Sequence, residues 1–176
     1  MRCLVALIGL LVTSGCVILA GEPSMHPHSE IMAPTFCLHD GKSEPRAITG
    51  IGVERGEKVN DDRIEWIESD EPWIAMWEGR DQAAWVLEYT PDDSDPPANT
   101  YACITYGKAP PGYKETTPAL PLTPERLYRV LIQTENGRAY VSMYFIIRLD
   151  SVGGPVKLEY TPTHLGADNV QVITQR

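Results

Sequence analysis

The chain has 176 residues, of which 15 are basic and 24 are acidic, so its net charge is −9. This charge argues against a nucleic acid partner, because a phosphate backbone needs a basic surface. The length is that of one domain with a real hydrophobic core. Short runs of aliphatic, β-branched and aromatic residues alternate with 15 prolines and 14 glycines, a composition that predicts an all-β fold.

The first fifteen residues have the layout of a secretory signal peptide. Arg2 supplies one positive charge, residues 3–12 are apolar, and three small residues at 13–15 precede Cys16. A cysteine in this place resembles the acylated cysteine of bacterial lipoproteins, which becomes the N-terminus of the mature protein. We therefore expect cleavage before Cys16, attachment of lipid (palmitate among the acyl chains) to that residue, and export of the rest of the chain.

Two other interpretations of this segment remain open. Cleavage near Ala20 would give a secreted protein without lipid, whereas the 17 residues from Leu4 to Ala20 reach the lower limit for a membrane anchor. All three interpretations place the remainder outside the cytoplasm. Val17 stands where an Asp would favour retention in the inner membrane, so we expect a lipid-anchored protein on the periplasmic face of the outer membrane.

Residues 16–30 are predicted to be a lipidated tether, and residues 31–176 a single folded domain. The tether range contains prolines and shows no periodic apolar pattern. His26 and His28 flank Pro27, but no cysteine or acidic cluster nearby completes a metal site. No metal and no other cofactor is expected.

Cys37 and Cys103 are the two cysteines left in the exported domain. Strands are expected over residues 35–39 and 99–106, and each strand carries one of them. In an oxidising compartment these two thiols are expected to form a disulfide; two free, buried thiols are the alternative. The bond would close a loop of 66 residues and stabilise the fold by roughly 4 kcal/mol in the chain-entropy model.

The clearest local signal is a hairpin of residues 126–134 and 138–149. Asn136-Gly137 lies between these strands and favours a type I′ turn. Residues 107–124 contain five prolines, which cannot donate to a sheet, and are expected to form a loop. The second hairpin strand is expected to bury one continuous apolar face: Ala139, Val141, Met143, Phe145, Ile147 and Leu149.

Other strands are expected from alternating apolar residues between turn signals. Their ranges are 47–55, 85–90, 156–160 and 170–174, while residues 63–77 fit either a strand or a short helix. About eight to ten short strands predict an immunoglobulin-like β-sandwich. A small β-barrel is the alternative.

Residues 54–95 hold 14 acidic and four basic residues, together with all four tryptophans. Tryptophans anchor interfaces and carboxylates steer a basic partner, so this segment is a candidate protein-binding surface. Alternatively the tryptophans belong to the core, which fits Trp66 and Trp85 because each alternates with other apolar residues. Asp92 to Asp95 lacks the calcium-loop spacing and is read as a solvated turn. The predicted partner-binding residues are Trp73, Trp77, Asp92, Asp93, Asp95 and, in the proline-rich loop, Tyr113.

Catalytic signatures are missing from the sequence. It contains no Gly-x-Ser-x-Gly elbow, no His-Glu-x-x-His motif and no glycine loop for phosphate. His39 and His164 are the histidines of the predicted domain, and a hydrolase built on Ser142 with one of them is an alternative that no motif supports. We therefore expect a protein that is not an enzyme.

The order of these features resembles the immunity lipoproteins encoded in type VI secretion clusters of Gram-negative bacteria, which carry a small domain of unknown function. A lipoprotein signal is followed by a strand with a cysteine, a second cysteine before a glycine, and a proline-flanked Tyr-x-Val strand. In place of the family's Pro-Gly-Lys, this chain has Pro124-Glu125-Arg126. The segments that carry the resemblance are 14–16, 36–38, 103–107, 121–124, 127–130 and 140–148.

The resemblance implies an immunity protein, which binds and neutralises a cognate secreted toxin in the periplasm. Such a protein needs no catalytic residues, and its lipid would hold it where a membrane-acting or wall-acting toxin works. An acidic face would suit a basic cleft on the toxin. The alternative is a structural or assembly lipoprotein that carries an immunoglobulin-like module in a cell-envelope machine.

Overall fold

The computed structural model describes residues 22–39, 46–58, 83–92, 94–96, 101–134, 140–162 and 171–174. All regular structure in these ranges is β-strand, and they contain no helix able to cross a membrane. The strands form one sheet of three and one sheet of seven, both antiparallel. They are β1 (Glu22–Met25), β2 (Thr35–His39), β3 (Ile48–Lys58), β4 (Ala83–Tyr89), β5 (Cys103–Thr105), β6 (Tyr113–Thr117), β7 (Arg126–Thr134), β8 (Tyr140–Leu149), β9 (Pro155–Pro162) and β10 (Gln171–Thr174).

The smaller sheet has the order β1-β2-β5. Strand β1 pairs with β2 along its whole length, from Glu22 opposite His39 to Met25 opposite Phe36. Residues 22–25 of the range expected to be a tether, 16–30, thus form a strand that pairs with the folded domain. A four-residue strand is too short to show a periodic pattern, which is why the sequence did not reveal it.

The larger sheet has the order β10-β9-β8-β7-β3-β4-β6. Strands β7 to β10 follow one another as a meander, and β3, β4 and β6 continue the sheet on the other side of β7. Strand β6 lies within residues 107–124, so the expected loop is wrong there. It has a single neighbour, β4, and an edge position tolerates flanking prolines. The described strands do not close into a barrel, since β10 and β6 end the sheet.

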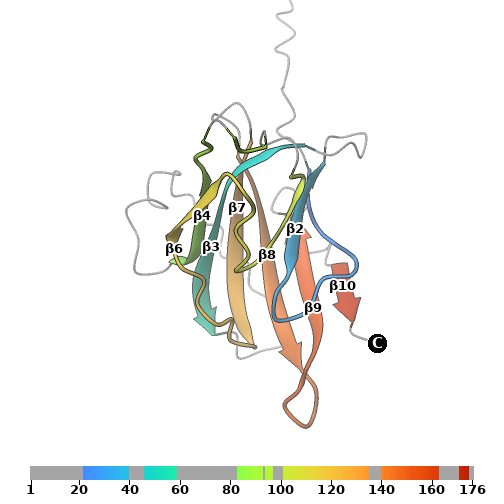
Figure 1. The fold of residues 1–176 in the computed structure, drawn as a ribbon. Coiled ribbons are helices and arrows are strands. Elements are labelled where there is room, and N and C mark those ends of the chain that lie inside the picture. The colour runs from blue at the N-terminus through green and yellow to red at the C-terminus, as the bar shows by residue number, and fades with distance from the viewer. Residues whose placement is uncertain are drawn as a thin grey trace, which may run out of the picture.

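One hydrophobic core contains residues of both sheets, and β2 crosses in front of the larger sheet in Figure 1. Direct pairing places Trp85, Val53 and Val130 in one row across β4, β3 and β7, and all three are fully buried. From the smaller sheet, the ring of Phe36 lies 5.7 Å from that of Phe145. Alternation along each strand thus supplies one apolar face to a shared core.

The apolar face expected on β8 is present in its middle. Met143, Phe145 and Ile147 are fully buried, whereas Leu149, at the end of the strand, is 37% exposed. Ile146 lies on the opposite face of the strand and is also fully buried. The strands expected at 35–39 and 126–134 match β2 and β7. The Asn136-Gly137 turn, Ala139 and residues 63–77 lie outside the described residues.

Candidate functional site

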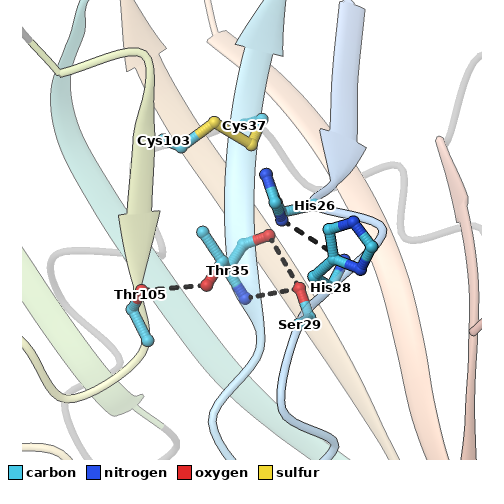
Figure 2. The surroundings of a disulfide bond; sticks show 7 residues. All are labelled: His26, His28, Ser29, Thr35, Cys37, Cys103 and Thr105. Atoms are coloured by element: carbon cyan, nitrogen blue, oxygen red, sulfur yellow. Dashed lines mark hydrogen bonds between the residues drawn. A yellow bond between two sulfur atoms is a disulfide. The ribbon is translucent and has the colours of Figure 1, made fainter. Parts of the chain in front are cut away.

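The two domain cysteines lie directly opposite each other on β2 and β5. Cys37 and Cys103 form a disulfide with an S–S distance of 2.05 Å, and their Cα atoms are 4.0 Å apart (Figure 2). Two residues along the same face, the hydroxyls of Thr35 and Thr105 share a hydrogen bond of 2.8 Å. The predicted disulfide is confirmed, and it joins the middle strand of the smaller sheet to its edge strand.

The acidic turn, residues 92–95, follows the end of β4 and has hydrogen bonds between Asp92 and Asp95. The backbone N–H of Asp92 donates to the Asp95 carboxylate at 2.9 Å, and the N–H of Asp95 donates to the carbonyl of Asp92 at 3.0 Å. Thr90 donates its N–H to the carbonyl of Gly112 at 2.8 Å, which ties the start of the turn to the loop before β6. The Asp95 carboxylate is therefore held by the backbone of Asp92, and the side chain of Asp92 is exposed beside it.

Gly112 brings this turn and the proline-rich segment into contact. Its φ is +82°, and a Cβ at this position would lie 2.9 Å from Cε2 of Tyr89 and 3.3 Å from Cβ of Asp95. Only glycine fits such a close approach at a positive φ. Two regions that the sequence suggested as separate binding surfaces, the acidic turn and the loop around Tyr113, are thus neighbours.

Tyr113 itself is a core residue, not the exposed anchor that the sequence suggested. Its side chain is 9% exposed, and its hydroxyl donates to the carbonyl of Ile48. Its ring lies 5.1 Å from that of Tyr89 and 5.7 Å from that of Tyr101. Burial raises the pKa of Tyr113 above its usual range, and the two neighbouring tyrosines add to the increase. Tyr113 therefore packs beside Tyr89, the last residue of β4 before the acidic turn.

The predicted contact residues Trp73, Trp77 and Asp93 lie outside the described residues, as does the predicted lipid acceptor Cys16, so their roles stay predictions. Trp85 is fully buried and donates its indole N–H to Glu115 at 2.7 Å. It follows the alternative interpretation, in which a tryptophan of this segment belongs to the core.

Glu54 is another acid of this segment that is not freely solvated. It lies opposite Arg129 on β7. Burial raises the pKa of the Glu54 carboxyl, and the positive charge of Arg129 offsets part of that effect. Nε of Arg129 is buried without a hydrogen-bond partner in the described structure. This pair belongs to the sheet and not to the acidic surface.

A hairpin tip, residues 150–154, joins β8 to β9 and extends beyond the neighbouring strands in Figure 1. The Asp150 carboxylate accepts hydrogen bonds from the N–H groups of Val152 and Gly154, at 2.9 and 2.8 Å. Val152 is 90% exposed at this tip. Sequence reasoning missed this residue, although an apolar side chain beside two glycines was a usable signal.

An ion-pair network holds the base of the same hairpin. Arg148 binds Glu125 and Glu159, each at 2.9 Å, and Lys157 binds Glu159 at 2.6 Å. Burial alone would raise the pKa of Glu159, but the hydrogen bonds from Lys157 and Arg148 outweigh it and lower that pKa. The pKa of Arg148 is raised, because its bonds to both carboxylates outweigh the opposing effect of burial. The four charged side chains of this network are therefore paired.

An open groove of about 710 Å³ lies between the segment after β1 and strands β9 and β10. Met25 and Tyr160 form part of its wall, and the hydroxyl of Tyr160 lies 2.5 Å from Oε1 of Gln171. His28 also lines the groove. The described residues contain no group of three or more His, Cys, Asp or Glu side chains able to hold a metal ion.

Comparisons of the chain with protein-family models, curated proteins and solved structures found no match. Among the described residues, the acidic turn and the hairpin tip each place an exposed side chain, Asp92 or Val152, on a turn held by hydrogen bonds.

Proposed function

We propose that the protein is an exported lipoprotein, anchored through Cys16 on the periplasmic face of the outer membrane, that binds and neutralises a cognate secreted protein toxin. In this proposal it belongs to the immunity lipoproteins of type VI secretion clusters, which its sequence resembles. In this proposal it acts by binding the toxin and not by catalysis.

The disulfide supports the export part of the proposal. Cys37 and Cys103 are paired in register and joined. Structural disulfides form and persist in oxidising compartments such as the periplasm and are rare in the cytosol. The proposed signal peptide before Cys16 points to the same compartment as the disulfide, whose cysteines are 66 residues apart.

The observation that carries the binding part is the fixed acidic turn. Asp92 is exposed on a turn whose backbone is held by hydrogen bonds and packed against Gly112. A prearranged turn loses little conformational entropy when a partner binds. Its carboxylates attract a basic surface and increase the association rate. A basic toxin cleft is the partner that this chemistry fits.

We also propose that the two sheets form a two-layer β-sandwich, because one hydrophobic cluster contains residues of both. The meander of β7 to β10 differs from the strand order of immunoglobulin domains, whose sheets are A-B-E-D and C-F-G. The proposal therefore keeps the sandwich without the immunoglobulin topology.

The test uses the cell that makes the protein. Deletion of its gene is expected to make the cell sensitive to killing by siblings with intact secretion, and the mature domain is expected to capture the product of an adjacent toxin gene in a salt-dependent manner. Resistance of the deletion strain, together with no binding to any adjacent gene product, would show that the proposal is wrong.

A further inference from the structure

The position of Glu22 at one end of the fold determines which end of a lipid-anchored form would lie nearest the membrane. Glu22 pairs with His39, at the end of β2 where Leu38 accepts the N–H of Arg46. The same end holds Tyr101, whose carbonyl accepts the N–H of Ile48 and whose ring packs on Tyr113. Gly112, the residue before Tyr113, packs against Asp95 of the acidic turn, so this turn is also at the Glu22 end.

The hairpin tip lies at the other end. Strand β8 has ten residues and ends at Leu149, immediately before the tip. A strand of this length spans roughly 30 Å, so the tip is separated from the Glu22 end by about that distance. Figure 1 shows the β8–β9 hairpin extending beyond the neighbouring strands.

The distance from Cys16 to Glu22 is limited by the number of residues. Six residues reach at most about 20 Å when fully extended, whatever conformation they adopt. A tether of fifteen residues, as expected from the sequence, would allow more than twice this reach. The first strand therefore places the Glu22 end close to any lipid attached at Cys16.

We infer that the mature protein stands on its membrane with the Glu22 end and the acidic turn toward the lipid and the hairpin tip pointing away. The short tether holds the Glu22 end near the lipid, and the far end is left pointing outward.

This orientation rests on the proposed lipidation and deepens the proposed function. The acidic turn faces the lipid headgroups, so a basic protein that binds it does so at the membrane surface. The inferred partner is therefore a toxin that works on the membrane itself or directly beside it.

The orientation can be measured without the toxin. In the mature lipoprotein Cys16 carries lipid and Cys37 is bonded to Cys103, so an introduced cysteine supplies the thiol for labelling. Asp92→Cys and Val152→Cys would be labelled with one small fluorophore and reconstituted in anionic vesicles that contain a headgroup quencher. Ser151→Cys is a second position at the tip, and circular dichroism verifies that each variant is folded.

The label at 92 is expected to be quenched at least about twice as strongly as the labels at 151 and 152, given the separation of roughly 30 Å between the ends. Inserting about ten Gly and Ser residues before Glu22 is expected to reduce this difference, because a longer flexible linker frees the orientation. Equal quenching, or stronger quenching at the tip, in protein that floats with the vesicles would overturn the orientation alone. Protein that fails to float with them would overturn the lipid anchor of the proposed function as well.

Discussion

Removal of the disulfide gives the sharpest stability test of the fold. The bond between Cys37 and Cys103 closes a loop of 66 residues. For a loop of that size the chain-entropy model gives about 14 to 15 cal/mol/K of lost entropy in the unfolded chain, which is about 4 kcal/mol at room temperature. Cys37→Ala with Cys103→Ala is expected to lower the free energy of unfolding by roughly that amount, a large share of the stability of a domain this size.

Urea denaturation of the mature domain is the assay. The variant is expected to have a lower midpoint and a larger m-value, because an unfolded chain without the crosslink exposes more surface. Thr35→Val with Thr105→Val is the matched control on the same face of the same two strands. Replacing both partners of a hydrogen bond with apolar groups of similar shape is expected to change stability by less than about 1 kcal/mol. A loss no larger in the cysteine variant than in this control would refute the entropic argument.

Three further predictions concern the hairpin base, the acidic turn and its partner. Arg148→Met is expected to reduce stability by about 1 kcal/mol at neutral pH, after allowing for solvent screening. Because the pKa of Glu159 is lowered in the folded protein, its ion pairs stabilise the fold above the unfolded-state pKa, and this stabilisation is lost as pH falls through the folded-state pKa. The free energies of unfolding of the wild type and Arg148→Met are therefore expected to converge in acid, which unfolding curves at several pH values would measure. Gly112→Ala is expected to destabilise the fold more than Gly153→Ala, because both glycines have a positive φ but, of the two, Gly112 alone has neighbours within 4 Å of an added Cβ. Thermal unfolding compares the two variants. Equal losses of about 1 kcal/mol would show that the close contacts of Gly112 add nothing to the cost of the positive φ. Replacing Asp92, Asp93 and Asp95 with Ser is expected to slow association with the toxin and weaken its salt dependence in stopped-flow kinetics, and unchanged rates would argue against steering.

Local patterns explain which strands were predictable. The ranges of β2 and β7 follow directly from alternation between clear turn residues. Strand β1 was missed because four residues show too little of a period, and β6 because prolines surround it. Proline argues against a central strand, but β6 is an edge strand, and only the order of strands decides which positions are edges.

The candidate site follows the same division. The presence of Cys37 and Cys103 in an exported chain was enough to predict their bond, because two thiols have one intramolecular partner each. The exposure of Tyr113 was not predictable from its position among prolines, because burial depends on Tyr89 and Tyr101, which reach it from other parts of the chain. The ion pairs of Arg148 likewise join residues 23 and 11 positions away.

The sequence by itself determined the all-β class, the disulfide pair and the acidic turn, because each depends on residue type and short-range pattern. Only the tertiary structure decided that the acidic turn lies beside Gly112, that Tyr113 is buried, and that Glu22 and the Val152 tip are at opposite ends. These relations come from pairings between distant segments. Such pairings depend on which apolar faces cover one another in the folded chain, and a period read along a single strand contains no information about that choice.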